Sequence, residues 1–273
     1  MFHEPVLCCI AKDEELYIIE WITYHLKIGF YKIFIYDNND DFTKLPNCLK
    51  ILDPELRKKI IIIHFPGKYK QMNAYNHFLK NYSNNWKWVA IIDCDEFIVI
   101  KNSNYIPIKK ILIKCCKEGS LGLHWKLFGN NHKDIYEDIP VTSRFIKCDK
   151  ILNPHIKSIS VCKDISHFNN PHYPILYNHK KQKDYLGRII TGPLQYNGLD
   201  NDTICVNHYF CKTKKEWDIK RERGLADKPG KRDESEYEPH NKNDVEDLFA
   251  SNFYKSICEP NAHFKSSLES DHC

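Results

Sequence analysis

Residues 86–97 read WKWVAIIDCDEF, and this stretch decides the fold class. Trp86–Ile92 has the length and apolar character of a buried strand, and two carboxylates follow it at Asp93 and Asp95. Side chains two residues apart on an extended backbone point the same way, so both carboxylates should emerge together where the strand meets solvent. Paired carboxylates suit a hard divalent cation that keeps room for substrate phosphates. A solvated acidic turn is the alternative interpretation.

The residues before this stretch alternate between strand-like and helix-like segments. The apolar runs of strand length are Val6–Ile10, Lys32–Tyr36 and Lys59–Phe65. Between them, apolar residues recur at the helical period from Leu16 to Ile28, with Gly29 as a helix-ending glycine, and again over Gln71–Tyr82. This alternation predicts βαβ units, so we expect an α/β fold with a mostly parallel central sheet.

Polar clusters follow three of the predicted strands. They are Lys12-Asp13-Glu14, Asp37-Asn38-Asn39 and Asp93-Cys94-Asp95. Ligands of parallel sheets bind beyond the carboxyl ends of the strands, so we expect the three clusters to converge on one edge. Asp37 could accept hydrogen bonds there from ribose hydroxyls or a base N–H, or it could simply stabilise a turn.

The pattern weakens after residue 100. Predicted helices are Ile106–Cys116, Lys212–Arg223 and Asp244–Tyr254, and predicted strands are Gly122–Lys126, Thr142–Lys147, Lys157–Cys162 and Thr203–Phe210. Gly224–Asn243 is polar and holds two prolines and two glycines, which is typical of a mobile loop. The stretch from Glu259 onward is expected to fray.

Composition excludes several classes of protein. The chain has 273 residues with 42% hydrophobic and 28% charged residues, which is ordinary for a globular protein and excludes general disorder. A net charge of +4 is not the footprint of a nucleic-acid binder. The sequence shows no apolar stretch long enough for a membrane helix and no secretory signal, and its twelve cysteines resemble buried thiols more than a disulfide framework. We therefore expect a cytoplasmic protein in a reducing compartment.

An ordered series of short motifs resembles a glycosyltransferase group, the family 2-like and family 92-like enzymes of GT-A fold. The series is Ala11-Lys12-Asp13-Glu14, Glu20-Trp21, Tyr24-His25, Tyr36-Asp37-Asn38, Gln71, Ala74-Tyr75-Asn76, Trp88 to Phe97, Trp125, Phe128-Gly129, His132, Arg144-Phe145, Lys157-Ser158-Ile159, Asn207-His208-Tyr209, Lys220 and Arg223-Gly224. It spans about residues 6–226, and the ordered set is more specific than any single motif.

The resemblance implies a Rossmann-like GT-A domain over residues 1–273. Within it, residues 1–100 would form the nucleotide-sugar-binding half, 101–223 the acceptor half, and 224–273 a polar loop with a C-terminal helix. The activity implied is transfer of a sugar from a nucleotide-diphosphate donor, with a UDP-sugar favoured, to a glycan, lipid or protein hydroxyl, with inversion. Mn²⁺ or Mg²⁺ would bridge the donor diphosphate and stabilise the leaving group.

The resemblance also assigns roles to individual residues. The metal ligands implied are Asp93, Asp95 and His208; the donor contacts are Ala11, Lys12, Asp13, Asp37, Gln71, Asn76, Cys94, Lys220 and Arg223; and Trp125 would meet the acceptor. His132 is the first candidate for the catalytic base, since an imidazole suits that role near neutral pH, and Glu96 is the second. Two other functions stay open: a non-catalytic sugar- or nucleotide-binding module of GT-A shape, and a metal-dependent phosphohydrolase that uses the same carboxylates.

Overall fold

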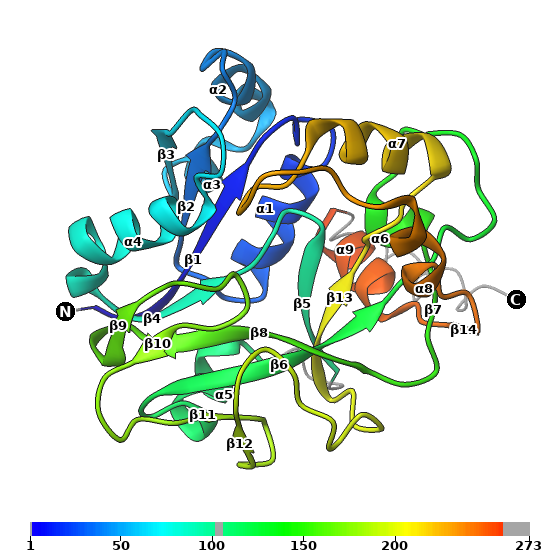
Figure 1. Cartoon of the computed structure of the whole chain (residues 1–273). Coiled ribbons are helices and arrows are strands. Elements are labelled where there is room, and N and C mark those ends of the chain that lie inside the picture. The colour runs from blue at the N-terminus through cyan, green and yellow to red at the C-terminus, as the bar shows by residue number, and fades with distance from the viewer. Residues whose placement is uncertain (1, 102–105, 259–273) are drawn as a thin grey trace, which may run out of the picture.

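The computed structural model describes residues 2–101 and 106–258 as a mixed α/β fold around one large sheet (Figure 1). Its strands are β1 Phe2–Ala11, β2 Lys32–Asp37, β3 Ile60–His64, β4 Trp86–Ile91, β5 Glu96–Ile100, β6 Ser120–Leu127, β7 Lys147–Cys148, β8 Asn153–Val161, β9 Ile165–His167, β10 Ile175–Leu176, β11 Gln182–Lys183, β12 Ile189–Ile190, β13 Ile204–His208 and β14 Val245–Glu246.

Helices cover both faces of this sheet. They are α1 Ile18–Lys27, α2 Lys44–Cys48, α3 Pro54–Arg57, α4 Gln71–Asn81, α5 Ile108–Cys115, α6 Val141–Arg144, α7 Lys214–Arg223, α8 Tyr237–His240 and α9 Phe249–Cys258, with short 3₁₀ turns at Leu49–Ile51, Ser83–Asn85, Cys162–Asp164 and Glu234–Glu236. No helix in the described ranges is both long and apolar enough to span a bilayer.

The order of the strands explains where the polar clusters meet. Along the sheet the order is β12-β11-β6-β8-β4-β1-β2-β3, and β13 pairs with both β5 and β6. Strands β4, β1, β2 and β3 are parallel neighbours, whereas β8 runs antiparallel between β4 and β6. The carboxyl ends of β1, β2 and β4 therefore share one edge, as the sequence predicts for a mostly parallel sheet.

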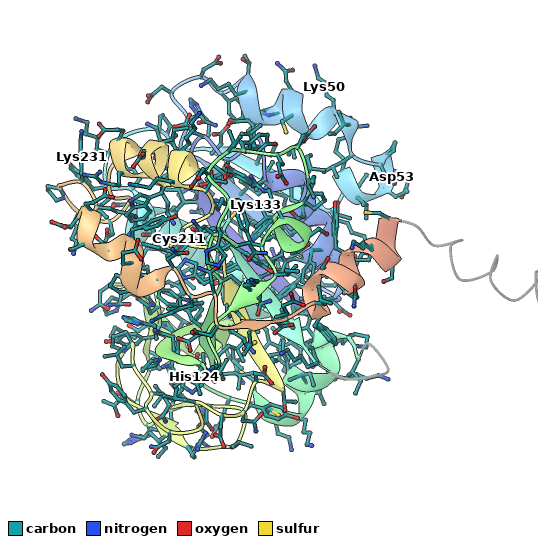
Figure 2. All side chains as sticks on the ribbon, turned by 90° about the vertical axis from the view of Figure 1, so that its right-hand side faces the viewer. Lys50, Asp53, His124, Lys133, Cys211 and Lys231 are labelled. Atoms are coloured by element: carbon teal, nitrogen blue, oxygen red, sulfur yellow. The ribbon has the colours of Figure 1, made fainter. Side chains whose placement is uncertain are left out.

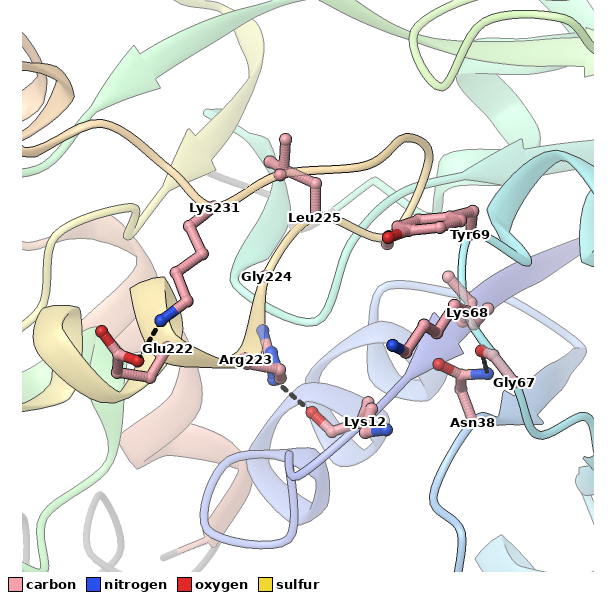
Figure 3. A pocket seen from close by; sticks show the side chains of 13 residues that line it. Lys12, Asn38, Gly67, Lys68, Tyr69, Glu222, Arg223, Gly224, Leu225 and Lys231 are labelled. Atoms are coloured by element: carbon pink, nitrogen blue, oxygen red, sulfur yellow. Dashed lines mark hydrogen bonds and ion pairs between the residues drawn. The ribbon is translucent and has the colours of Figure 1, made fainter.

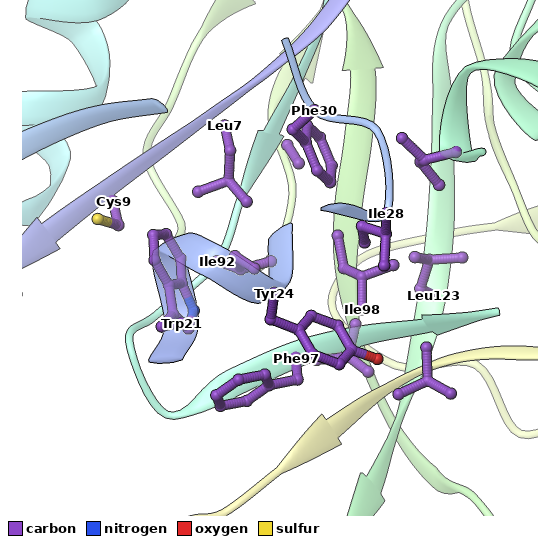
Figure 4. Close-up of a cluster of buried hydrophobic side chains, with 14 of the residues drawn as sticks. Leu7, Cys9, Trp21, Tyr24, Ile28, Phe30, Ile92, Phe97, Ile98 and Leu123 are labelled. Carbon is purple, nitrogen blue, oxygen red and sulfur yellow. The ribbon is translucent and has the colours of Figure 1, made fainter. Parts of the chain in front are cut away.

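Alternation along the parallel strands builds two hydrophobic layers. In β1, Leu7 and Cys9 join the larger cluster with Trp21 of α1, and Val6 and Cys8 join the smaller cluster with residues of α4. Figure 4 shows part of the larger cluster, in which Trp21 and Tyr24 of α1 lie against Phe97 and Ile98 of β5. Both faces of the strands are covered, which accounts for their continuous apolar sequences.

The early elements match the sequence predictions closely, but four later ones differ. The run after Asp95 forms β5, which the pattern did not predict. Thr142–Lys147 is not a strand, because α6 occupies its first half and β7 holds only its last residue. The predicted loop 224–243 contains the helix α8, and the predicted helix from Asp244 begins only at Phe249, after β14. The prediction of fraying from Glu259 falls outside the described residues.

The misassigned segment 142–147 has an identifiable cause. The buried carboxylate of Glu20 accepts hydrogen bonds from the backbone N–H groups of Val141 and Thr142, at 2.6 and 3.0 Å, and from the Thr142 hydroxyl at 2.6 Å. A carboxylate that satisfies the free N–H groups of a first turn stabilises a helix start. The partner lies more than a hundred residues away in the chain, so the local sequence gives no sign of it.

Candidate functional site at the carboxyl edge of the sheet

Two cavities of about 290 Å³ each lie side by side at this edge. The first, called here the basic pocket, is lined by Lys12, Asn38, Lys68, Tyr69, Arg223 and Lys231 among others. The second, called here the aspartate pocket, is lined by Gln71, Asp93, Cys94, Asp95, Trp125, Lys157, His172, His208 and Lys220 among others. Ile10, Leu225 and Ala226 line both, so the cavities meet at the segment that follows α7.

The turn that carries the two aspartates is held rigidly. Glu96 places its Oε2 at 2.8 Å from the backbone N–H of Asp93, and its own N–H donates to the Asp93 carbonyl. The buried indole of Trp21 donates to the carbonyls of Asp93 and Glu96, at 3.1 and 2.8 Å. Four hydrogen bonds therefore fix the backbone of the turn that follows β4, and this turn sets the direction of the Asp93 and Asp95 carboxylates.

Asp93 is paired with the buried cation Lys157. Its Oδ2 lies 2.7 Å from Lys157 Nζ, and its Oδ1 accepts a hydrogen bond from Gln71 at 3.0 Å. Burial alone would raise the pKa of Asp93, but the Lys157 ammonium reverses this and holds that pKa below its usual value. The same ammonium lies 3.3 Å from Glu96, whose pKa burial raises to about 8.

Asp95 is paired with a second lysine, which comes from α7. Its Oδ2 lies 2.6 Å from Lys220 Nζ, and its Oδ1 lies 3.6 Å from Nε2 of His208. Burial would raise the pKa of Asp95, yet Lys220 and His208 hold it well below its usual value. The Lys220 ammonium also lies 4.0 Å from the centre of the Phe210 ring, a cation–π contact. Burial lowers the pKa of Lys220 to about 8.

His208 reaches the aspartates because the chain returns to the sheet centre in β13. Its register places it opposite Glu96 on β5 and beside Leu127 on β6. Burial lowers the pKa of His208 to about 4, so the ring is neutral near pH 7. Its Nδ1 is buried and has no hydrogen-bond partner among residues 2–101 and 106–258. An imidazole with an uncommitted nitrogen beside a carboxylate has the chemistry of a metal ligand.

These residues fit a divalent cation in chemistry, although their carboxylates are paired with lysines in this structure. Two aspartates and a neutral imidazole supply the oxygen and nitrogen ligands that Mn²⁺ or Mg²⁺ accepts. Within residues 2–101 and 106–258, no group of three or more His, Cys, Asp and Glu side chains stands ready to hold an ion. The Lys157 and Lys220 ammonium groups supply the positive charge here instead.

The helix that carries Lys220 is fixed at its start. Thr213 and Glu216 form a reciprocal capping box at the first turn of α7. The Glu216 carboxylate also receives two hydrogen bonds from Arg144, at 2.8 and 3.0 Å, and one from the Tyr17 hydroxyl at 2.7 Å. Arg144 is fully buried, so this two-pronged contact is shielded from water and ties α7 to α6.

The basic pocket is lined by cationic side chains from two distant parts of the sequence, Lys12 and Lys68 from the first 70 residues and Arg223 and Lys231 from the end of α7 and the segment after it (Figure 3). Arg223 donates to the Lys12 carbonyl and lies 2.7 Å from the Glu14 carboxylate. Lys68 and Lys231 line the opposite walls, and Lys231 pairs with Glu222. Figure 2 places Lys231 at the outer edge of the molecule, on the segment that follows α7. A cavity lined mainly by positive charge suits an anionic ligand such as a diphosphate.

Several predicted donor contacts do not reach either pocket. Asp37 is fully buried, and its Oδ1 accepts the Asn39 N–H at 3.0 Å, so it stabilises a turn. Ala11 is buried at the end of β1, and Asp13 is exposed and lines neither cavity. Asn76 is also corrected, because its side-chain amide binds both the N–H and the carbonyl of Phe168.

The two candidates for the catalytic base also lie away from the cavities. His132 is exposed in the loop after β6 and lines neither pocket, so the structure does not support the prediction that it meets an acceptor. Glu96 is fully buried behind the Asp93 turn and faces Lys157. A base must lie within hydrogen-bond reach of the substrate hydroxyl, and neither position provides this.

Trp125 lines the aspartate pocket, but not as an open stacking surface. Three imidazoles pack around its indole, with ring-centre distances of 5.0 Å to His155, 5.2 Å to His172 and 4.3 Å to His208. Trp125 is only 8% exposed and supports the histidines beside it, so it lines the pocket without an open ring face, and its acceptor contact stays a prediction.

The structure adds residues that the predicted site omitted. Lys157 and His172 line the aspartate pocket, and the segment from Leu225 to Arg232 forms the wall between the cavities. Lys157 stands between Ile156 and Ile159 in a predicted strand, and a lysine in such a strand was a signal, since lysine is rarely buried without a partner. His172 lies in the stretch His167–Tyr173, whose histidine, asparagine, proline and aromatic residues were a signal for an acceptor contact.

Comparisons with known proteins agree with this architecture. Residues 4–185 match the family model described as glycosyltransferase family 92. A family 92 protein of Oryza sativa subsp. japonica is 30% identical over 96 residues, which are 35% of this chain and 16% of that protein. One of Arabidopsis thaliana is 28% identical over 112 residues, 40% of this chain and 19% of that protein. These matches cover less than a fifth of either relative.

A solved structure of a putative glucose-1-phosphate thymidylyltransferase from Bacillus anthracis is a distant match. It aligns with 12% identity and a TM-score of 0.28, over 50% of this chain and 65% of that one. The family model, by contrast, covers most of the chain, including β1 to β4, the aspartate turn and Lys157. The chain belongs to glycosyltransferase family 92.

Proposed function

We propose that this chain transfers a sugar from a nucleotide-diphosphate donor, with a UDP-sugar favoured, to a hydroxyl of a glycan, lipid or protein. The observation that carries the proposal is the pair of adjoining cavities at the carboxyl edge of the sheet. One is lined by cations and the other by paired carboxylates, an imidazole and lysines. A nucleotide sugar has the same two-part character, with an anionic diphosphate joined to a neutral, hydroxyl-rich ring.

The cations have a direct role in such a transfer. As the bond between the anomeric carbon and the phosphate oxygen breaks, negative charge develops on the leaving nucleoside diphosphate. Lys220 and Arg223 face that region from α7, and preorganised positive charge lowers the energy of the transition state there. Arg144 and Glu216 hold the start of α7, so they keep both cations in place.

Asp93, Asp95 and His208 would hold a divalent cation, Mn²⁺ or Mg²⁺. The ion would act as a Lewis acid that neutralises the donor diphosphate. The chain's own lysines prepare this site, because they keep both aspartates ionised despite their burial. We propose inversion at the anomeric carbon, in a single displacement by the acceptor hydroxyl.

A donor screen tests this function. Purified protein would be incubated with Mn²⁺ and a panel of nucleotide sugars, and binding would be measured by thermal shift, because a ligand of the folded state raises the melting temperature. The best donor would then be offered to mixed glycan, lipid and protein acceptors. We expect product only with both substrates, and loss of product in EDTA that excess Mn²⁺ restores.

The same experiment separates the two other functions. A phosphohydrolase would release nucleotide from the donor at the same rate without an acceptor. A non-catalytic module would bind the donor and release nothing. Either result would contradict the proposed transfer.

A further inference from the structure

His172 lines the aspartate pocket but is not one of the proposed metal ligands, and its surroundings fix the position of the proton on its ring. Its Nδ1 lies 3.0 Å from the Ile156 carbonyl. Because a carbonyl can only accept, Nδ1 must carry the proton, and in the neutral ring Nε2 then carries the lone pair. His172 lines the pocket, so Nε2 is the ring nitrogen left to meet a ligand.

The backbone around His172 is fixed as firmly as the ring. Its N–H donates to the Asn170 side chain at 2.8 Å, and its carbonyl accepts from the Ser158 hydroxyl at 3.0 Å. The ring packs against Trp125 and His155. Burial and the nearby Lys157 ammonium lower the pKa of His172 to about 3, so the ring stays neutral across the physiological range. Such an imidazole is a preorganised hydrogen-bond acceptor.

The pocket is polarised, which indicates what this acceptor meets. Lys220, Lys228 and Arg232 bring three positive charges from α7 and the segment after it, and Asp227 and Glu236 bring two negative charges from that segment, so the net charge there is positive. Pro171, His172 and Trp125 form an uncharged wall that comes from β6 and the loop after β9. A donor whose diphosphate faces the cations would place its sugar ring toward the uncharged wall. Sugar hydroxyls are hydrogen-bond donors, and an uncommitted imidazole nitrogen is a suitable partner for one.

We propose that Nε2 of His172 accepts a hydrogen bond from a hydroxyl of the donor sugar and thereby contributes to the choice of sugar. This inference rests on the proposed function, since it requires a nucleotide sugar in the site. A site built to accept from a hydroxyl discriminates against a sugar that lacks it, because the buried acceptor is then left unpaired.

Binding measurements with and without the sugar test this. The probes are uridine diphosphate, UDP-glucose and UDP-galactose, each titrated calorimetrically in the presence of Mn²⁺. His172→Phe keeps a ring but removes the acceptor. We expect it to weaken binding of the preferred UDP-sugar about tenfold, the effect of losing one neutral hydrogen bond, and to leave uridine diphosphate unchanged. His172→Gln, which can present an oxygen near the position of Nε2, should restore at least half of the loss on a logarithmic scale.

The matched control is His155→Phe. His155 stacks on the same indole, but it does not line either cavity. We expect its variant to bind all three probes as the wild type does. A sugar derivative that lacks the contacted hydroxyl should bind the wild type and His172→Phe equally, and a series of deoxy donors would identify that hydroxyl.

Two results would overturn the inference. If His172→Phe binds the UDP-sugar as tightly as the wild type, no hydroxyl is read by this ring. If the variant weakens uridine diphosphate and the UDP-sugar equally, His172 only supports the fold of the pocket. Wild-type protein that binds none of the nucleotide sugars in the wider donor screen would instead contradict the proposed function.

Discussion

The site holds two buried lysine–aspartate pairs, Lys157–Asp93 and Lys220–Asp95, and the two lysines differ in their surroundings. Lys157 lies on β8 with Asp93 on one side and Glu96 on the other, and these two carboxylates raise its pKa against the effect of burial. Lys220 lies on α7, and within residues 2–101 and 106–258 Asp95 is the single carboxylate paired with it; burial lowers the pKa of Lys220 to about 8. Lys157 is therefore fixed in the sheet by two carboxylates, whereas Lys220 lies on a helix beside the cavity with one.

The difference shows how a buried charge can serve two purposes. A cation between two carboxylates stabilises the fold, because removing it leaves both partners unpaired in a low-dielectric interior. A cation that shares its surroundings with Lys212 and Arg232 is held less strongly, so it can exchange its partner when an anionic ligand or a metal ion arrives. We expect stability to depend on Lys157 and ligand chemistry to depend on Lys220.

The largest effect is expected at the carboxylate on the ligand side. Asp95→Asn keeps the shape of the side chain but removes its charge, so transfer should fall about a thousandfold or more, as for the loss of a main electrostatic group at a reacting centre. The measurement is single-turnover transfer with saturating donor and Mn²⁺. Asp218→Asn, at an exposed position on the same helix as Lys220, is the control and should be unaffected. An Asp95→Asn enzyme with wild-type rates would remove Asp95 from the site.

The second test compares the lysines directly. Lys157→Met should lower the free energy of unfolding by about 3 kcal/mol, since it leaves Asp93 and Glu96 without their cation. Lys220→Met should cost less than Lys157→Met, because it leaves one carboxylate, Asp95, without its cation rather than two. Urea unfolding of both variants without ligand measures the difference. Equal losses would show that the two pairs are alike and that the comparison fails.

The third test uses a buried titratable group without a counter-charge. His25 donates from Nδ1 to the Trp21 carbonyl and accepts at Nε2 from the Ile98 N–H, and burial lowers its pKa to about 3. The unfolded histidine titrates near 6.5, so between these values the unfolded chain binds more protons and stability falls as the pH falls.

At pH 5, one such group contributes a slope of about 1.4 kcal/mol per pH unit. We expect the unfolding free energy of His25→Phe to depend less steeply on pH between pH 6 and 4, by the slope that one such histidine contributes. Unfolding free energies of both proteins at several pH values measure this. A difference in absolute stability between the variant and the wild type leaves this test unaffected, because only the slope of stability against pH is compared. Identical slopes in the two proteins would mean that His25 is charged or accessible in the folded state.

The smallest effect is expected at Asp37, a carboxylate that has no lysine partner and lines neither pocket. Asp37→Asn should leave the dissociation constant of the donor within about twofold of the wild type, since binding changes require contact with the ligand. Calorimetric titration of the best donor measures it. A tenfold loss with unchanged stability would restore Asp37 to the donor site that the family resemblance implies.

The parallel half of the fold could be predicted because its signals are local. Apolar runs and helical periodicity depend on neighbouring residues, and the strands at Val6–Ile10, Lys32–Tyr36 and Trp86–Ile92 are confirmed as parts of β1, β2 and β4. Ligands at strand ends follow from the same topology, which is why Lys12 and Cys94 line the cavities. Gln71, Lys220 and Arg223 also line them, but they lie on α4 and α7 and were assigned through the family resemblance.

The rest of the site depends on contacts between distant segments. His172 enters the pocket only because β8 lies between β4 and β6 and positions the loop that follows β9. Glu20 fixes α6 across more than a hundred residues, and Arg144 fixes α7 in turn. No spacing rule encodes such pairs, so the sequence analysis placed His132 beside the acceptor and gave Lys157 no role in the site.

Cys94 lies between the two aspartates, and the reactivity of its thiol is a built-in probe of the conformation of the site. The thiol lines the aspartate pocket yet is only 4% exposed, and its contact with Cys9, together with burial, raises its pKa well above the usual value. Alkylating reagents attack thiolates, so this cysteine should react slowly until the turn opens. The rate at which Cys94 is alkylated therefore reports how often the turn opens locally, and a bound ligand that keeps the turn closed should lower this rate.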